Sequence, residues 1–200
     1  MPGSAPYGRV RTHEGQRLNA ANYYARFGVP VASTTEASCE KGKPVNDLFD
    51  AEIRGHHSMR DLVLTVVSDE ELAYQLPGKN PTLGELLIEM GHLQGVYTYS
   101  FQAFELDWQH RQLPTPDPLT IAGLSAWFAA QDTVMKTALD RFTDEDLRID
   151  RIDRGDGFVA SPFVQVQIYR EAVYIFYGKL SVYLKALERD PGATWAAGVG

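Results

Sequence analysis

Hydrophobic residues recur every three or four positions along four long stretches of the chain. This spacing is typical of amphipathic helices, and it predicts helices over residues 46–67 (starting at 46 or 47), 82–104, 121–142 and 161–188. The apolar face of the fourth stretch is so wide that this helix must be buried on more than one side, as in a helical bundle. We therefore expect an all-α four-helix bundle.

Start signals support two of these helices. Ser161 has the side chain of a good N-cap, and Pro162 follows at the first helical position. Thr82 and Glu85 have the three-residue spacing of a capping box. Both signals place a helix start at the beginning of an apolar stripe.

The connections indicate how the predicted helices are ordered. Residues 109–118 contain three prolines and cannot be helical for long. The roughly dozen residues from 108 to 120 span about 40 Å when extended at ~3.3 Å each. This connection can run the length of a bundle, so we expect the second and third helices to be parallel. A small hairpin is expected within residues 149–160, turning through residues 155–157, Gly-Asp-Gly.

Outside the bundle, the chain has two predicted extensions. Residues 1–45 are rich in Gly, Pro, Ser and Thr, and we expect an extended arm with a short helix over residues 18–27. The Asp-Pro-Gly sequence at residues 190–192 breaks the last helix. The expected organisation is therefore an arm (1–45), a bundle (46–190) and a C-terminal tail (191–200).

Composition narrows the partners and the compartment. The 200 residues carry a formal net charge of −7, which opposes binding to nucleic acid or to an anionic membrane. No apolar run approaches the length of a membrane span, and residues 1–4 do not resemble a signal peptide. The single cysteine, Cys39, allows no internal disulfide and fits a reducing compartment. Cys39 lies near two lysines that could activate it, but no partner base is identifiable. We expect a cytoplasmic protein.

Two local motifs resemble those of the DinB/YfiT-like family. Residues 82–87, TLGELL, are similar to the family's TLxELL, and residues 178–184, GKLSVYL, to its RGQLxxYL. The layout matches over about residues 46–188. The resemblance implies an up-down-down-up bundle with a long crossover between helices two and three, and usually a homodimer. Some members of the family are known only as proteins induced by DNA damage, so the resemblance also implies a protein associated with DNA damage or stress.

The resemblance also implies a metal site that this sequence has lost. Many members bind one divalent metal through three histidines and use a low-molecular-weight thiol as co-substrate. The corresponding positions here are Glu89, Ala172 and Phe176, and no histidine follows His110. We expect a degenerate site that binds no metal or other cofactor, with Phe176 filling the place of the metal.

Replacement ligands are the alternative. On the helical wheel, Glu52 and His56 fall on the apolar face of the first helix, with His57 further round, and Glu89 lies on a neighbouring helix. One histidine and two carboxylates can hold a divalent metal such as zinc or nickel, and a small shift in register would add His92. A carboxylate among apolar residues could instead act as a general acid or base. The other interpretation is a buried polar cluster in which His56 is hydrogen-bonded to a carboxylate.

Three functions remain open from the sequence. The first is a non-catalytic protein that binds a small ligand or a partner. The second is a metal- and thiol-dependent transferase that uses the replacement ligands, and the third is a structural dimer module. Homodimerisation is expected because Val96, Tyr99, Ala103 and Tyr174 are apolar positions that the core stripes do not include.

Overall fold

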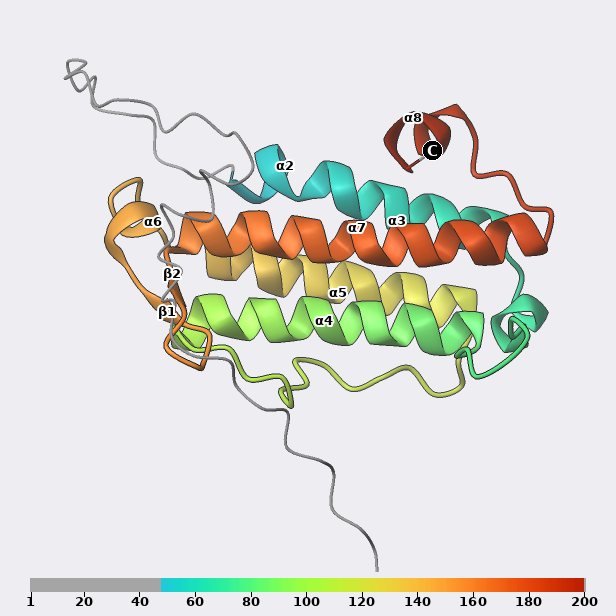
Figure 1. The fold of residues 1–200 in the computed structure, drawn as a ribbon, viewed down its shortest axis with the longest axis horizontal. Coiled ribbons are helices and arrows are strands. Elements are labelled where there is room, and N and C mark those ends of the chain that lie inside the picture. Colours follow the sequence, from blue (N-terminus) through green and yellow to red (C-terminus); the bar gives the residue numbers. More distant parts are fainter. Residues whose placement is uncertain (1–47, 200) are drawn as a thin grey trace, which may run out of the picture. The chain divides into compact units, whose positions relative to one another are not determined.

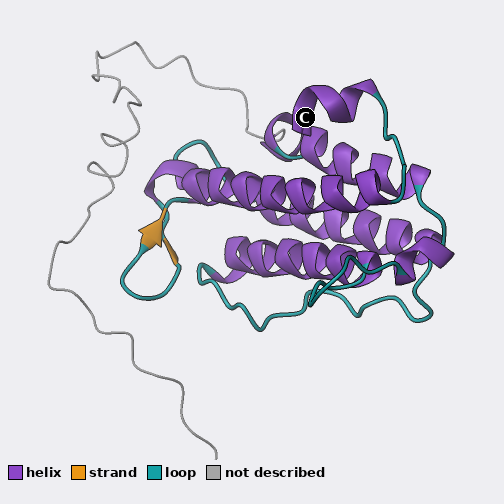
Figure 2. Cartoon of the chain, turned by 45° about the vertical axis from the view of Figure 1, so that its right-hand side comes forward, coloured by secondary structure: helices purple, strands orange, loops and turns teal. Residues whose placement is uncertain are grey.

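The computed structural model describes residues 48–199, and its architecture is an all-α helical bundle (Figure 1). Four long helices pack side by side around a core of aliphatic and aromatic side chains. Short helices flank them, and a two-stranded hairpin lies at one end of the bundle (Figure 2). The elements in chain order are α2 (Leu48–Glu52), α3 (Arg54–Val66), η1 (Glu70–Ala73), α4 (Leu83–Ala103), α5 (Ile121–Leu139), α6 (Asp146–Ile149), β1 (Ile152–Asp153), β2 (Val159–Ala160), α7 (Pro162–Ala186) and α8 (Ala193–Val199).

Helices α4 and α5 run in the same direction. Gly91 of α4 lies against Trp127 of α5, and ten residues further along α4 the ring of Phe101 contacts that of Phe142, just beyond α5. Figure 1 shows the connection between them returning along the whole length of the bundle. This is the parallel arrangement that the proline-rich connection led us to expect.

Helix α7 runs antiparallel to α4. Gln165 near its start donates a hydrogen bond of 2.8 Å to Ser100 near the end of α4. Towards the other end, the Tyr183 hydroxyl donates to the backbone oxygen of Pro81, just before α4 begins. The order of these contacts fixes the register between the two longest helices.

The predicted start signals are present. The backbone N–H of Glu85 donates to the Thr82 hydroxyl over 3.1 Å, and the Glu85 carboxylate accepts from the Thr82 backbone N–H over 2.7 Å, which completes the capping box. Ser161 caps α7 through a bond of 3.4 Å from the N–H of Val164. The local sequence therefore determines where α4 and α7 begin.

The first predicted helix is bent at Ile53, so the prediction of one uninterrupted helix is wrong. Ile53 has φ −120° and ψ −43°, which separates α2 from α3. The i to i−4 hydrogen bonds continue through it, from Ile53 N–H to Phe49 and from His57 N–H to Ile53. The Ile53 side chain is 1% exposed. The two helices therefore form one bent rod that turns Ile53 into the core.

The predicted hairpin before α7 is confirmed. Strands β1 and β2 pair antiparallel, with Ile152 opposite Ala160, and both of these side chains are buried. The turn has positive φ at Gly155, Asp156 and Gly157. This backbone conformation favours glycine, and glycine occupies two of the three positions.

The C-terminal residues, predicted as a tail, contain a short helix that packs against the bundle. They form α8, which is anchored by Trp195, a residue that is only 5% exposed. Its indole N–H donates to the Ser181 hydroxyl over 3.2 Å, and its ring contacts that of Tyr177 at 5.4 Å. The sequence predicted only a C-terminal tail over residues 191–200, because a seven-residue helix with one large apolar side chain has too little periodicity to be recognised.

Within residues 48–199, no helix combines the length and the apolar character that crossing a bilayer requires. The predicted arm, the short helix over residues 18–27 and Cys39 all lie outside the described residues.

Candidate functional site

A group of polar side chains links all four long helices inside the bundle. It consists of His57 and Arg60 from α3, Gln94 from α4, Asp132 from α5 and Tyr169 from α7, and we call it the Arg60–Asp132 cluster. Four of its members are at most 2% exposed, and only the Asp132 side chain, at 23%, reaches solvent. Polar groups buried to this extent require partners.

The Asp132 carboxylate is the centre of the cluster. The Arg60 guanidinium approaches both carboxylate oxygens, at 3.2 and 3.0 Å, and the Gln94 amide donates to one of them over 2.8 Å. The other side of the guanidinium lies 4.2 Å from the centroid of the Phe128 ring. Arg60 therefore combines a two-point ion pair with a cation–π contact, the environment in which arginine tolerates burial.

His57 connects the carboxylate to α7. Its Nδ1 atom lies 2.7 Å from an Asp132 oxygen, in a close but poorly aligned contact, and its Nε2 atom lies 2.7 Å from the Tyr169 hydroxyl. Because a carboxylate only accepts, the proton of neutral His57 is placed on Nδ1, and Nε2 accepts from Tyr169. Nε2 is thus hydrogen-bonded, whereas Nδ1 contacts the carboxylate without a well-aligned hydrogen bond.

Burial and pairing set the charges of the cluster. Burial lowers the pKa of His57 below its ordinary value, because its contact with Asp132 only partly offsets the loss of hydration. Burial alone would raise the pKa of Asp132, but the contacts with His57 and Arg60 outweigh it and hold that pKa well below its usual range. Burial also raises the pKa of Tyr169 well above its ordinary value. At pH 7 the cluster therefore holds one ion pair, a neutral imidazole and a neutral phenol.

The expected orientations of His56 and His57 are wrong. His57 is 2% exposed and points into the core, whereas His56 is half-buried at the edge of the bundle. His57 lies four residues after Ile53 and three before Arg60, so it belongs to the same buried stripe. A wheel weighted by hydrophobicity misses this stripe because it treats Arg60 as a surface residue.

The cluster itself was not found from the sequence, although a signal exists. Asp132 lies four residues after Phe128 and three before Met135, which is core spacing, and Arg60 occupies a comparable position on α3. Two opposite charges on the apolar faces of different helices are the pattern that a buried ion pair leaves in a sequence.

Glu52 and His56 do come together, but with Arg170 of α7 as their partner. The Arg170 Nε–H donates to His56 Nε2 over 2.9 Å, and its terminal nitrogen pairs with the Glu52 carboxylate. Burial, followed by the charge of Arg170, lowers the pKa of His56. Both predicted ligands are thus held by a cation of the protein's own.

A groove lies beside this pair, between the first helical rod, α7 and α8. Its volume is about 340 Å³, near the lower end for small-molecule sites. The Tyr174 ring meets the His56 ring edge-on at 5.0 Å along one wall. The lining residues are Ala51, Glu52, Gly55, His56, Met59, Tyr174, Thr194, Ala197 and Gly198.

The remaining candidate ligands lie elsewhere. Glu89 is exposed on α4. His92 bonds to the Thr115 hydroxyl over 3.1 Å and packs edge-on against Trp127. The four candidate replacement ligands therefore do not converge, and no group of three or more His, Cys, Asp or Glu that could hold a metal occurs in the described part of the chain.

The three residues predicted to occupy the family's ligand positions do not form a set of metal ligands. Glu89 is exposed, Ala172 is half-buried without a donor atom, and Phe176 is buried. The ammonium of Lys179 lies 4.8 Å from the centroid of the Phe176 ring. A fixed positive charge beside a position without donor atoms opposes a second cation there.

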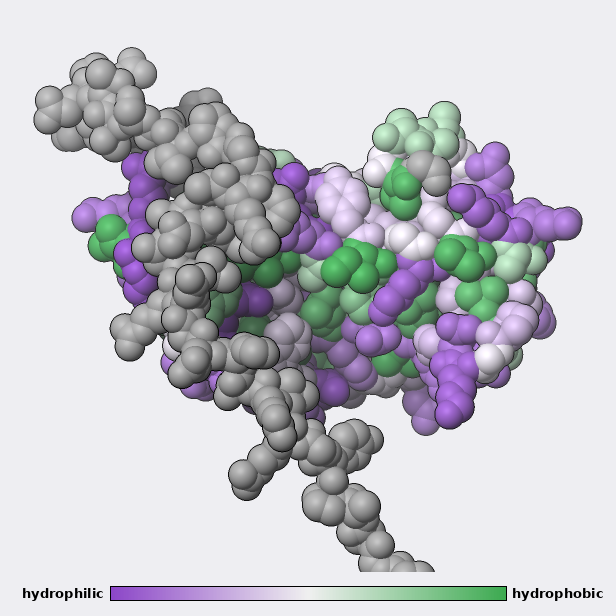
Figure 3. Space-filling view, in the orientation of Figure 1, coloured by the Kyte–Doolittle hydropathy of each residue, from purple (hydrophilic) through white to green (hydrophobic). Residues whose placement is uncertain are grey.

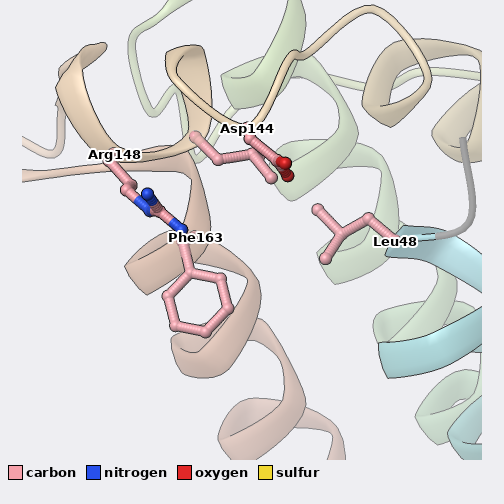
Figure 4. A pocket seen from close by; sticks show the side chains of 5 residues that line it. Leu48, Asp144, Arg148 and Phe163 are labelled. Atoms are coloured by element: carbon pink, nitrogen blue, oxygen red, sulfur yellow. The ribbon is translucent and has the colours of Figure 1, made fainter. Parts of the chain in front are cut away.

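A second cavity, of about 400 Å³, lies at the hairpin end of the bundle (Figure 4). Leu48 enters it from α2 and Phe163 from α7, while Asp144 and Arg148 come from the segment around α6. Its walls are mainly apolar, and none of the described residues that line it is a nucleophile or a histidine.

The fold is similar to that of a DinB-like protein from Bacillus subtilis, YjoA, known from a crystal structure. The two superpose with a TM-score of 0.56 and 14% sequence identity over 70% of this chain and 91% of that one. No protein-family model matches the sequence, and neither does any curated protein. The chain therefore has a DinB-like fold, as the two sequence motifs indicated.

Proposed function

We propose that this chain is a DinB-like, stress- or DNA-damage-associated bundle protein with a degenerate metal site. In this proposal it acts in the cytoplasm by binding a small ligand or a partner, and not by metal-dependent catalysis. The observation that supports this most is that the histidines in and beside the core already have partners within the protein. His57 is hydrogen-bonded to Tyr169 through Nε2 and contacts the Asp132 carboxylate through Nδ1, and His56 accepts from Arg170.

A metal would have to break these contacts before it could bind. Recruiting His57 would leave the buried Tyr169 hydroxyl without its hydrogen-bond partner, at a cost of about 1–3 kcal/mol, and would remove one of the contacts of the Asp132 carboxylate. Recruiting Glu52 and His56 would bring the metal next to the Arg170 guanidinium. Neither arrangement offers the open set of ligands that catalytic metal sites have.

The groove beside His56 is the ligand site in this proposal. It places a phenol, an imidazole and a thioether opposite small residues of α8, which suits a small molecule with an apolar body and one hydrogen-bonding group. Low-molecular-weight thiols are the first compounds to test, because the family resemblance implies them.

Metal content provides the first test. Elemental analysis of the full chain, purified without a His-tag or chelator, should find far less than one transition metal per chain. About one zinc or nickel per chain would overturn the proposal. It would favour instead the thiol-dependent transferase, with Glu52 and His56 as the metal ligands, because both residues line the same groove.

Ligand binding provides the second test. Glutathione, cysteine and coenzyme A should be titrated against the full chain and followed by thermal shift and calorimetry. A ligand that binds the groove should lose at least about tenfold in affinity on Tyr174→Ala, and it should be unaffected by His92→Ala, which changes a histidine on another face. Equal losses in both variants would place the ligand elsewhere and refute the groove as its site.

A further inference from the structure

Tyr169 is a buried phenol whose hydroxyl is hydrogen-bonded to a base. It is 2% exposed on the inward side of α7, beneath the surface along that helix where Figure 3 shows hydrophobic and charged patches interspersed. Its hydroxyl donates to Nε2 of His57 over 2.7 Å, a distance at which a proton can transfer directly. Burial lowers the pKa of His57 and raises that of Tyr169, so at pH 7 the imidazole is neutral and the phenol is protonated.

The Arg60–Asp132 cluster prepares His57 to hold a second proton. Nδ1 of His57 lies 2.7 Å from the Asp132 carboxylate, so an imidazolium formed here has an anion beside it. The Arg60 guanidinium opposes that charge, but it is already paired with both Asp132 oxygens. A phenol with such a base loses an electron more easily than a phenol without one. Its proton leaves in the same step, and the phenoxyl radical that remains is neutral.

A row of aromatic rings connects Tyr169 with solvent. The centroid of the Tyr97 ring lies 5.1 Å from that of Tyr169, and the centroid of Trp108 lies 6.4 Å from that of Tyr97. Both separations are those of directly packed aromatic pairs. Tyr97 is buried, whereas Trp108, on the α4–α5 connection, is 53% exposed. Electrons tunnel efficiently between rings in such contact, so the row joins the buried phenol to the surface.

Tyr97 itself is poorly suited to hold an electron vacancy. The Arg154 guanidinium lies 5.6 Å from the centroid of the Tyr97 ring, and this positive charge opposes the loss of an electron there. Arg154 also donates to the Tyr97 hydroxyl over 3.5 Å, and no described residue accepts the phenolic proton. The vacancy therefore comes to rest on Tyr169, the ring of the row whose proton has an acceptor.

We propose that this chain acts as a one-electron donor, in which Tyr169 fills an electron vacancy made at Trp108 and passes its phenolic proton to His57. The oxidant is a diffusing radical such as nitrogen dioxide, which takes one electron from the exposed Trp108 indole and becomes nitrite. An electron then moves from Tyr169 through Tyr97 to Trp108. The O–H bond of Tyr169 breaks as an N–H bond forms at Nε2 of His57, and the products are a neutral phenoxyl radical and an imidazolium.

A small reductant such as ascorbate closes the cycle. Ascorbate gives one electron at the surface, the electron returns along the same row to the Tyr169 radical, and His57 gives the proton back. Each cycle converts one diffusing radical into nitrite and leaves the protein unchanged. Burial keeps the Tyr169 radical from coupling with a second radical in the meantime. The activity is separate from the proposed ligand binding, because it uses neither the groove nor a metal.

Tyr183 is the matched comparison on the same helix. It is nearly as deeply buried as Tyr169, at 3%, but its hydroxyl donates to the backbone oxygen of Pro81, which is not a base. Its ring contacts that of Tyr74, with centroids 6.3 Å apart. Tyr183 therefore shares the burial of Tyr169 but has no proton acceptor.

Tyr99 is the comparison at the surface. It was expected to lie at a dimer surface with Val96, but Val96 is buried, and Tyr99 stacks on His110 with ring centroids 4.1 Å apart. The Tyr99 hydroxyl donates to the Glu105 carboxylate over 3.0 Å. Tyr99 therefore has an acceptor, but one that is open to solvent.

Flash-quench oxidation of the full chain tests the proposal. Laser excitation of tris(bipyridine)ruthenium(II), quenched by hexaammineruthenium(III), yields an oxidant that takes one electron from exposed side chains. Transient absorption and electron paramagnetic resonance should detect a tyrosyl radical in the wild type. Tyr169→Phe should lose most of this signal, whereas Tyr183→Phe and Tyr99→Phe should keep it. Circular dichroism verifies that each variant folds.

The path and the proton acceptor have their own readouts. Trp108→Phe should slow the formation of the tyrosyl radical, because phenylalanine is not oxidised under these conditions. Radical formation in the wild type should be slower in heavy water than in light water, and His57→Gln should remove this difference. High-field electron paramagnetic resonance of the wild type needs no variant, and it should show an exchangeable proton hydrogen-bonded to the phenoxyl oxygen.

Four results would overturn the proposal. A wild type without a tyrosyl radical, or a signal that persists in Tyr169→Phe, would exclude Tyr169 as the donor. A rate indifferent to Trp108→Phe would exclude the aromatic row as the path. A radical whose oxygen has no exchangeable proton nearby would exclude transfer to His57.

Discussion

Arg60 is a charged side chain that is only 1% exposed, and its position is stable only because of the groups around it. Transferring an ion into the interior costs several kcal/mol, which a good ion pair approximately offsets. Such a pair contributes little net stability compared with well-packed apolar residues, but removal of one partner leaves an uncompensated charge. The cluster therefore favours one arrangement of the four helices, because only that arrangement brings Arg60 and Asp132 together.

The first prediction concerns the loss of this cation. Arg60→Met keeps an unbranched side chain about as long as the aliphatic stem of arginine but removes the guanidinium, which leaves Asp132 without its ion-pair partner. It should lower the free energy of unfolding by about 3–5 kcal/mol. Arg54→Met is the control, because Arg54 pairs with Asp50 on the helix surface, where such pairs contribute about 0.3–0.5 kcal/mol. Urea denaturation monitored by circular dichroism measures both. Similar losses in the two variants would show that the Arg60 pair is no more important than a surface pair.

The second prediction concerns pH. The pKa of His57 is lowered in the folded state, so below about pH 6.5 the unfolded chain binds more protons and the free energy of unfolding falls. The His57 contribution is fully present above pH 6.5 and is lost as the pH falls towards the folded pKa. His56 and His92, whose pKa values are also lowered, contribute with the same sign. Asp132, with a lowered pKa, contributes stability that is lost only below about pH 4.

The variant His57→Gln measures how much the buried histidine contributes to the pH dependence of the unfolding free energy. Between pH 7 and 5, this variant should show a clearly flatter decline in unfolding free energy than the wild type, whatever its absolute stability. His92→Gln, at a half-buried site, should change the slope less. An unchanged slope in His57→Gln would mean that His57 does not resist protonation in the folded state.

At the scale of the elements, the close packing of α4 against α5 depends on glycine. A Cβ atom placed on Gly91 would lie 2.2 Å from the Trp127 ring, closer than any real contact. Trp127 is only 6% exposed and is enclosed by its neighbours, so the ring cannot easily move aside.

The third prediction follows from this contact. Gly91→Ala should destabilise the protein by about 1–3 kcal/mol through overpacking, even though alanine favours a helix. Gly55→Ala is the matched control, because nothing lies within 4 Å of a Cβ at Gly55, and it should be neutral or stabilise by up to about 1 kcal/mol. Calorimetric melting of the two variants compares them. If Gly91→Ala melts as high as wild type, the α4–α5 contact is looser than the structure indicates.

The sequence was most informative for the elements. Hydrophobic periodicity located the long helices, the Thr82 capping box marked the start of α4, and three prolines identified the crossover, because each of these signals is local in the chain. The bend at Ile53 was missed because the hydrogen bonds of the helix continue through it. Helix α8 was missed because it depends on one tertiary contact, that of Trp195.

The candidate site was much less predictable. The pairing of Arg60 with Asp132 joins residues 72 positions apart, and the core spacing of each residue indicates burial without showing which charge it meets. Glu52 and His56 were identified as neighbours, but Arg170, the residue that holds them, was counted as part of the polar stripe of its helix. Burial makes these groups functional candidates, and burial is a property of the packed bundle.

For the whole molecule, α8 determines whether the groove exists. Thr194, Ala197 and Gly198 form one of its walls, and these residues are held against α7 through Trp195. Helix α8 contacts only α3 and α7 appreciably, and it lies at the end of the described chain. Such a segment can detach without unfolding the rest.

The last prediction is that Trp195→Ala releases α8 and leaves the bundle folded. A core Trp→Ala change costs about 3–5 kcal/mol, but here the loss cannot exceed the free energy that holds α8 in place, because α8 dissociates instead. Hydrogen exchange followed by mass spectrometry should show protection lost over residues 193–199 and kept in α4 and α5.

The control is Trp108→Ala, at a residue 53% exposed on the crossover, which should leave the protection of both regions unchanged. Binding of any groove ligand should fall together with the protection of α8, since one wall of the groove has gone. A uniform loss of protection in all helices would mean instead that α8 folds as part of the bundle.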